Sequence, residues 1–364
     1  MWVGVFPELS QTGGIQQVSR HAGAVLMKRA RERNLACELL GLNDARGRGS
    51  FKVGAEAYEF TGFGRDKMSL FFFLLRRVAR IEVLVLGHVN LAPIGLLLRF
   101  VRPRMQYWIV AHGVEVWEPL PRFRRWGLQC AQKIISVSAF TKSAMVKAQN
   151  VDPQRVFVLP PGLDPSFTQD SHDATPGALP ASGRVLLTVG RLISCEPGKG
   201  VESVIKSLAK VIAAIPDTFY VIIGDGDLRP RLEEMARENG VSERVIFIGA
   251  LQLEQLKAYY ARADVFVMPS RQEGFGIVYL EAMASGKPVI SGDVGGAPEI
   301  VQDGVTGFTV PPDDIETLTA RLIQLLQDEA LRVKMGEAGR QRVEAGFRFA
   351  CFETGLTKIL DAPA

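Results

Sequence analysis

Short apolar runs alternate with amphipathic segments along the second half of the chain, and this alternation restricts the fold more than any other feature. Segments with helical spacing of apolar residues separate the runs. Buried strands separated by helices predict a parallel sheet covered on both faces, which is a doubly wound α/β domain. The predicted strands are Arg184–Gly190, Phe219–Gly224, Val245–Gly249, Val265–Met268 and Pro288–Ser291, and the predicted helices are Val201–Ala214, Leu228–Asn239, Leu253–Arg262 and Ile277–Ser285.

The first half carries the same pattern in a less regular form. A length of 364 residues suits two domains. We predict a Rossmann-like domain over 1–165, a linker over 166–183, a second Rossmann-like domain over 184–346, and a helix near 347–360 that packs back on the first domain. Such sheets bind ligands beyond the carboxyl ends of their strands, so we expect a cleft between the domains. The first-half strands are Val3–Phe6, Leu35–Leu42, Val83–Gly87, Tyr107–His112, Ile134–Val137 and Val156–Leu159, with helices at Gln16–Arg33 and Phe140–Gln149.

The segment 269–288 (PSRQEGFGIVYLEAMASGKP) is the most informative part of the sequence. Glu273 lies in a loop after a predicted strand, and Glu281 follows after seven intervening residues, about one turn inside a predicted helix. Gly274 and Gly276 leave main-chain N–H groups open at the helix N-terminus, which attracts an anion such as a diphosphate. One glutamate alone would be a solvated surface charge. Two that bracket a Gly-Phe-Gly turn favour a ligand site, where they would accept hydrogen bonds from sugar hydroxyls.

This segment resembles the E-x7-E signature of the retaining glycosyltransferases of family 4, also called group 1. The resemblance covers nearly the whole chain, and its pieces occur in the order and spacing of the family. Two small departures are a longer segment before Lys199 and a Pro-Gly where many relatives have Asn-Gly. The matching pieces are Gly13-Gly14, His112 in Ala-His-Gly, SVSAFT at 136–141, PGLD at 161–164, Val189-Gly-Arg191, Lys199-Gly200, GGAPE at 295–299 and DGVTG at 303–307.

The resemblance implies the GT-B fold, an α/β architecture of two Rossmann-like doubly wound domains that face each other across a cleft. It also implies a nucleotide-diphosphate sugar as co-substrate, no cofactor and no metal, because Arg191 and Lys199 stabilise the charge that develops on the β-phosphate. The implied catalytic residues are His112, Arg191, Lys199 and Glu273. The implied donor-binding residues are Gly13, Gly14, Gly190, Arg191, Lys199, Glu273, Gly274, Phe275, Gly276, Ile277 and Glu281.

Other candidate sites have simpler interpretations. Asp225-Gly226-Asp227 has the form of a metal-binding D-x-D, but it follows a predicted strand and is typical of a tight turn. The four cysteines are scattered without ligand spacing, which indicates neither zinc nor a disulfide framework and fits a reducing compartment. We expect His21, His88 and His172 to be structural. No signal peptide and no apolar stretch of membrane-spanning length is evident, so we expect a cytoplasmic protein.

The charge is uneven, with a net charge of +9 over residues 1–183 and −5 over residues 184–364. Clusters of arginine beside apolar residues, at 70–80, 94–104 and 122–126, suit contact with an anionic membrane at its inner face, where a lipid-linked acceptor would lie. Amphipathic helices whose arginines extend into water explain the same clusters equally well. Nucleic acid is disfavoured, because no recognition motif is present.

The sequence leaves several functions open. The first is transfer of a sugar to a glycan or lipid-linked acceptor, in cell-envelope or exopolysaccharide biosynthesis. A sugar-nucleotide epimerase on the same fold would bind the same donor but need no acceptor. A non-catalytic nucleotide-sugar-binding protein would have no need of Arg191, Lys199 and the two glutamates. A nicotinamide-dependent dehydrogenase fits poorly, because the sequence after Gly224 fails at the third glycine of G-x-G-x-x-G.

Overall fold

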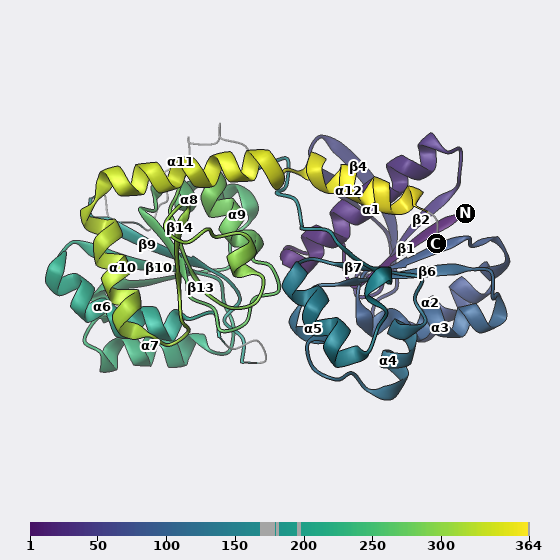
Figure 1. The fold of residues 1–364 in the computed structure, drawn as a ribbon, viewed down its shortest axis with the longest axis horizontal. Coiled ribbons are helices and arrows are strands. Elements are labelled where there is room, and N and C mark those ends of the chain that lie inside the picture. Colours follow the sequence, from purple (N-terminus) through teal and green to yellow (C-terminus); the bar gives the residue numbers. More distant parts are fainter. Residues whose placement is uncertain (168–178, 180–181, 195–197, 363–364) are drawn as a thin grey trace. The chain divides into compact units, whose positions relative to one another are not determined.

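The computed structural model describes residues 1–167, 179, 182–194 and 198–362. Most of the predicted linker 166–183, with His172, and also Cys195 lie outside the described residues. The chain forms two compact units. The first is Met1–Ser166 together with Phe347–Ala364, and the second is Phe167–Gly346 (Figure 1).

The first unit contains a mostly parallel eight-stranded sheet in the order β3-β4-β2-β1-β5-β6-β7-β8, in which only β3 runs antiparallel to its neighbour. Its strands are β1 (Trp2–Phe6), β2 (Cys37–Gly41), β3 (Gly47–Val53), β4 (Glu56–Gly62), β5 (Val83–Leu86), β6 (Gln106–Ala111), β7 (Lys133–Ser136) and β8 (Val156–Val158). Its helices are α1 (Gly14–Glu32), α2 (Lys67–Leu75), α3 (Ala92–Val101), α4 (Arg122–Gln129), α5 (Ala139–Gln149) and α12 (Phe349–Asp361).

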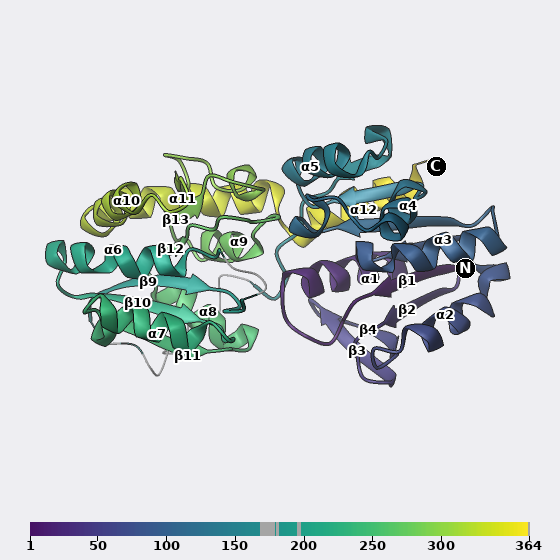
Figure 2. The ribbon, with the colours of Figure 1, turned by 90° about the horizontal axis from the view of Figure 1, so that it is seen from below.

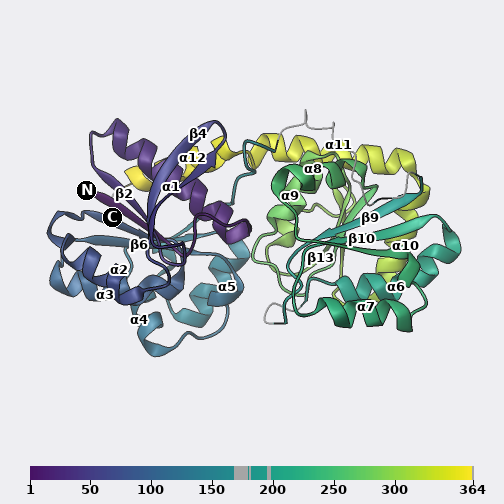
Figure 3. The same ribbon diagram turned by 180° about the vertical axis from the view of Figure 1, so that it is seen from behind.

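Helices cover both faces of this sheet. Helices α2 to α5 lie on one face and α1 and α12 on the other, as Figures 1 and 3 show from opposite sides. Because strand side chains alternate between faces, Leu84 and Leu86 of β5 join the core with the first helix group, while Val85 points to α1 and α12. Helix α12 is held at its C-terminus by the buried Lys133, whose Nζ donates to the carbonyl oxygens of Ile359 (2.7 Å) and Ala362 (2.6 Å).

The second unit contains a fully parallel six-stranded sheet in the order β11-β10-β9-β12-β13-β14. Its strands are β9 (Arg184–Val189), β10 (Thr218–Ile223), β11 (Val245–Gly249), β12 (Val265–Met268), β13 (Val289–Gly292) and β14 (Gly307–Val310). Its helices are α6 (Val201–Ala214), α7 (Arg229–Glu238), α8 (Leu253–Arg262), α9 (Ile277–Ala284), α10 (Ile315–Gln327) and α11 (Glu329–Gly346).

Counted along this unit, the strand order is 3-2-1-4-5-6, the order of the Rossmann fold. Strands β10 and β11 are added on one side of β9, and β12 to β14 on its other side. The loops after β9 and β12 therefore diverge and leave a crevice at the carboxyl edge of the sheet. Helices α6, α7 and α10 cover one face and α8, α9 and α11 the other (Figures 1 and 3). The predicted doubly wound α/β architecture is confirmed. In the described part of the chain, no helix combines the length and apolar character needed to cross a bilayer.

Sequence reasoning missed the β3–β4 hairpin and strand β14. Strand β3 (GRGSFKV) carries two glycines and exposed polar residues, so it lacks the continuous apolar run that marks a buried strand. It pairs through its backbone from Gly47 opposite Gly62 to Val53 opposite Glu56, at the edge of the sheet. Strand β14 has only four residues, too few for a periodic signal.

Candidate functional site

Gly190 and Arg191 follow β9 directly, at the switch point of the second sheet. The Gly190 N–H donates to the Ile223 carbonyl oxygen (2.9 Å), and the next strand end packs so tightly that a Cβ on Gly224 would collide with the Gly190 carbonyl oxygen. Gly224 has φ +134°, which favours glycine. The exposed Arg191 therefore extends from a backbone that two strands hold in place.

Lys199 and Glu273 form an ion pair at this edge. The Lys199 Nζ donates to Glu273 Oε2 at 2.9 Å, and the two side chains are 25% and 12% exposed. Lys199 precedes α6, the helix after β9, and Glu273 lies in the loop after β12. The pair therefore bridges the two strands that flank the switch point, which is where ligands of this sheet type bind.

Backbone contacts hold the two loops against each other. The Arg271 N–H donates to the Gly198 carbonyl oxygen (2.7 Å), and Gly200 (φ +75°) has no room for a Cβ beside the Pro269 carbonyl oxygen. The Gly296 N–H donates to the Glu273 carbonyl oxygen (2.7 Å). Lys199 and Glu273 therefore stand on loops whose positions are already determined.

Helix α9 begins at this edge of the sheet. Its N-cap is Gly276 with φ +100°, and Phe275 and Ile277 on either side are buried. A Cβ at Gly276 would lie against the Tyr279 ring, whose hydroxyl donates to the Met268 carbonyl oxygen at 2.9 Å. The first N–H groups of a helix have no intrahelical partner, and they carry the positive end of its dipole. The Glu273–Ile277 turn therefore suits a diphosphate.

Glu281 lies inside α9 and is 8% exposed. The hydroxyl of Tyr260, which comes from α8, donates to Glu281 Oε2 at 2.7 Å. Burial, and after it the charge of Glu281, raise the pKa of Tyr260 well above its usual value, so the phenol keeps its proton. Sequence reasoning missed Tyr260. The signal available was a tyrosine on the buried side of a helix, which needs a partner for its hydroxyl.

The remaining predicted site residues belong to the first unit. Gly13 (φ +143°) ends the loop after β1 and is the N-cap of α1, and Gly14 is the first residue of that helix. His112 follows β6. The structure therefore brings Lys199, Glu273 and the start of α9 together in the second unit and places Gly13, Gly14 and His112 in the first unit.

His112 is held by two contacts within the first unit. Its backbone N–H donates to Glu115 Oε1 (2.6 Å), and its Nε2 lies 2.8 Å from the Gly87 carbonyl oxygen. Because a carbonyl only accepts hydrogen bonds, Nε2 carries the ring hydrogen in the neutral form and Nδ1 is the acceptor.

His88, which we expected to be structural, stacks on His112 with ring centroids 5.8 Å apart. Burial and the neighbouring His112 lower the pKa of His88 to about 4, so His88 is neutral near neutral pH. Sequence reasoning missed this neighbour of His112. The signal available was that each histidine follows one of two adjacent parallel strands.

The two aspartates of the D-x-D segment accept hydrogen bonds from backbone N–H groups of nearby turns. Asp227 Oδ1 accepts from the Ser194 N–H (2.8 Å), and Asp225 Oδ1 accepts from the Gly226 N–H (2.8 Å). Among the residues that the structure describes, no group of three or more His, Cys, Asp or Glu side chains could hold a metal ion.

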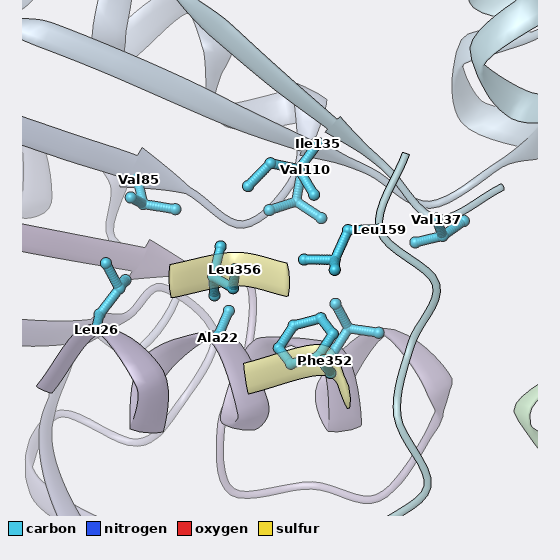
Figure 4. Close-up of a pocket in the computed structure, with 10 residues that line it drawn as sticks. Ala22, Leu26, Val85, Val110, Ile135, Val137, Leu159, Phe352 and Leu356 are labelled. Carbon is cyan, nitrogen blue, oxygen red and sulfur yellow. The ribbon is translucent and has the colours of Figure 1, made fainter. Parts of the chain in front are cut away.

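One enclosed cavity lies inside the first unit, between the sheet and helices α1 and α12 (Figure 4). Its volume is about 10 Å³ and all its lining residues are apolar, among them Ala22, Val110 and Leu356. A single water needs about 10–15 Å³ and polar partners. The cavity is therefore a packing gap and not a substrate site.

Comparison with known proteins identifies the family. The model "Glycosyl transferases group 1" matches residues 173–342, and the model "Glycosyltransferase Family 4" matches residues 23–167. A GDP-mannose-dependent alpha-(1-6)-phosphatidylinositol monomannoside mannosyltransferase of Mycolicibacterium smegmatis is 38% identical in an alignment of 268 residues that covers 68% of this chain and 69% of the relative. A GDP-mannose-dependent monoacylated alpha-(1-6)-phosphatidylinositol monomannoside mannosyltransferase of Corynebacterium glutamicum is 43% identical over 46% of this chain and 45% of its own.

Solved structures show the same fold at lower identity. Sucrose-phosphate synthase from Thermosynechococcus elongatus superposes with a TM-score of 0.78 at 22% identity, covering 99% of this chain and 98% of its own. WaaG, a glycosyltransferase involved in lipopolysaccharide biosynthesis, superposes with a TM-score of 0.74 at 19% identity over the full length of both chains. The resemblance drawn from the sequence motifs is confirmed: the chain has the GT-B fold and belongs to the group 1 glycosyl transferases of glycosyltransferase family 4.

Proposed function

We propose that this glycosyltransferase moves a hexose from a nucleotide-diphosphate sugar to a glycan or lipid-linked acceptor, with retention of anomeric configuration and without a metal ion. The observation that carries the proposal is the Lys199–Glu273 pair, 2.9 Å apart at the switch point of the second sheet. A fixed cation at that place can meet the charge that develops on the departing diphosphate.

The proposed roles follow from the groups that each residue offers. Arg191 and Lys199 supply positive charge to the β-phosphate, and the N-terminus of α9 supplies N–H donors. Glu273 and Glu281 accept hydrogen bonds from hydroxyls of the sugar and the ribose. Gly13 and Gly14 let the backbone of the first unit approach the donor, and His112 offers Nδ1 or, when protonated, a charge near the sugar.

We further propose GDP-mannose as the donor and a phospholipid-linked mannoside as the acceptor. The support is the 38% identity to a GDP-mannose-dependent phosphatidylinositol monomannoside mannosyltransferase over two thirds of both chains. The reaction would then take place in the cytoplasm, at the inner face of a membrane. Retention is proposed from the family resemblance, and independence of metal from the cations that Arg191 and Lys199 already provide.

Thermal-shift measurement with GDP, UDP, ADP and CDP, with EDTA present, tests the donor site first. A nucleotide at one hundred times its Kd stabilises the fold by about 2.7 kcal/mol, which is readily measured. We expect GDP to give the largest shift. A shift with UDP alone would contradict the proposed base but keep the site, and no shift with any nucleotide would contradict the site itself.

Product analysis tests the chemistry. GDP-mannose incubated with a phosphatidylinositol mannoside acceptor should give a product whose new linkage, read by NMR, has the α configuration of the donor. A β linkage would contradict retention. Conversion of the donor to another nucleotide sugar in the absence of acceptor would instead indicate the epimerase alternative.

A further inference from the structure

We propose that one face of the first unit, formed by α2, α3 and α4, docks on an anionic lipid surface. This inference extends the proposed function, since a lipid-linked acceptor would have to be reached at a membrane. The three helices are consecutive in space. Helix α3 packs on both α2 and α4, and the view from below shows them side by side (Figure 2).

Exposed apolar side chains follow the outer side of each helix. They are Met68 and Phe72 on α2, Leu97 and Phe100 on α3, and Phe123 and Trp126 on α4. The spacings of three or four residues put each pair on one side of its helix, while Leu70, Leu74, Leu98 and Leu128 on the inner sides belong to the core. We call this surface, with the arginines described next, the basic–apolar face.

Aromatic rings join two of the helices on this face. The Phe100 ring lies edge-on to Trp126 at 5.6 Å, and Phe123 lies edge-on to the same indole at 6.4 Å. Phe100 is nevertheless 63% exposed and Trp126 46% exposed. Large apolar side chains that gather on an exposed surface mark an interaction site. Aromatic rings of this kind are favoured at the boundary between water and lipid.

Exposed arginines stand at the ends of the same helices. Arg76 is the C-cap of α2, Arg104 lies in the turn that follows α3, and Arg122 begins α4. None of the three helices contains an aspartate or a glutamate. Other arginines of this region are used inside the unit. Arg99 donates to the Cys130 carbonyl oxygen (2.7 Å) and Arg102 to the Val78 carbonyl oxygen (2.9 Å).

This combination selects an anionic lipid surface over the other occupants. A symmetric contact between two copies would place the arginines of one face against those of the other, and like charges disfavour that contact. Nucleic acid would engage the arginines but would gain nothing from Met68 and Leu97, which cannot stack on bases. Lipid engages both groups, because rings and aliphatic chains enter the headgroup boundary while guanidinium groups reach the phosphates.

The basic–apolar face also connects to the proposed active site along the chain. Helix α4 follows His112 after the short helix Val114–Val116 and one loop. Docking through α4 would therefore anchor the chain shortly after His112.

The test is sedimentation of the full chain with vesicles of phosphatidylcholine containing about one quarter phosphatidylglycerol, against vesicles of phosphatidylcholine alone. We expect binding to the anionic vesicles that weakens with salt. Removal of two rings in Phe100→Ser/Trp126→Ser should weaken binding at least tenfold. Because each basic residue near such a surface changes affinity about fivefold, Arg76→Gln/Arg104→Gln/Arg122→Gln should weaken it by about a hundredfold.

A matched control removes three exposed cations from the second unit, in Lys206→Gln/Lys210→Gln/Lys334→Gln. This variant changes the net charge equally and should bind vesicles as the natural chain does. If it loses binding equally, the attraction is a property of total charge and the basic–apolar face is not the docking site.

Fluorescence gives a second readout that does not depend on affinity. Of the four tryptophans, Trp2 and Trp108 are buried and Trp117 is half-buried against Phe140, whereas Trp126 is exposed. Trp126 should therefore account for most of a blue shift of emission when anionic vesicles are added. The variant Trp126→Phe should bind but show a smaller shift. Binding without any shift in the natural chain would place the contact elsewhere and overturn the proposal.

Further outcomes separate the competing partners from the proposed function. A dimer in vesicle-free solution that Phe100→Ser/Trp126→Ser converts to monomer, without vesicle binding, would assign the face to a second copy. Binding to single-stranded RNA but not to vesicles would assign it to nucleic acid. The thermal shift with GDP does not involve the basic–apolar face. A failure of vesicle binding would therefore not contradict the proposed donor site, and a failure of GDP to stabilise the chain would not contradict the proposed docking.

Discussion

Replacing Lys199 with alanine should reduce turnover far more than it reduces stability. The substitution removes an ammonium group that lies 2.9 Å from Glu273 on a loop held by backbone contacts to Pro269 and Arg271. Because the loop is fixed, no neighbouring cation is expected to move into the empty place. Removal of one preorganised group that stabilises transition-state charge costs about 10²–10³ in kcat, or about 2.7–4 kcal/mol.

The effect of Lys199→Ala on stability can be bounded from the same geometry. At 2.9 Å the gross Coulomb attraction is about 6 kcal/mol with an effective dielectric constant near 20, but desolvation offsets most of it. Lys199 is 25% exposed, so the net loss should be about 1 kcal/mol, which lowers Tm by about 2–4 °C. The variant therefore stays folded at assay temperature, and its loss of rate reports on chemistry.

The assay is single-turnover kinetics with radiolabelled GDP-mannose at saturating concentration, which separates transfer from product release. Lys199→Arg should keep part of the rate, because it retains the charge. Lys210→Ala, an exposed lysine on α6, should leave the rate unchanged. If Lys199→Ala transfers mannose at the natural rate while its Tm falls as expected, the ion pair is structural and the assigned role is wrong.

The remaining predictions concern buried polar groups. Glu281→Ala should weaken GDP binding in calorimetry by at least tenfold, whereas Tyr260→Phe, which keeps the carboxylate, should lower Tm with a smaller effect on affinity. Equal losses of affinity in both variants would contradict a direct contact. Burial lowers the pKa of His21 in the folded chain below its ordinary value of 6.5, against the opposing charge of Asp164 3.5 Å away. As the pH falls, the unfolded chain therefore binds a proton at His21 before the folded chain does, and the free energy of unfolding should fall below about pH 6.5. The urea midpoint of His21→Gln should fall less over the same pH range. Parallel plots of urea midpoint against pH for the two proteins would refute this. Lys133→Met should lower the urea-derived stability by about 1–3 kcal/mol, because the carbonyl oxygens at the end of α12 lose a charged donor, and an unchanged midpoint would contradict it.

The architecture could be predicted because parallel strands are buried on both faces. Each such strand reads as a short continuous apolar run, as in Phe219–Gly224, which corresponds closely to β10 (Thr218–Ile223). The sequence pattern did not predict the β3–β4 hairpin, because an edge strand has one exposed face and tolerates polar residues and glycines. Its pairing is decided by backbone hydrogen bonds that no side-chain pattern records.

The loop-and-helix placement of Glu273 and Glu281 also followed from the sequence alone, since a glycine pair after an apolar strand marks a turn into a helix. The contacts of these residues did not. Lys199 meets Glu273 although 74 positions separate them along the chain, and Tyr260 meets Glu281 across 21 positions. Such distances depend on strand order and on how closely two loops pack.

The sequence by itself determined the fold class, the family and the segments that carry the proposed chemistry, because apolar periodicity and turn residues are local properties of the chain. Only the tertiary structure decided which side chains meet. It brought β9 beside β12, so that Lys199 reached Glu273, and β5 beside β6, so that His88 stacked on His112. It also decided which apolar residues of α2, α3 and α4 enter the core and which remain exposed, because burial depends on the neighbouring elements that cover a helix.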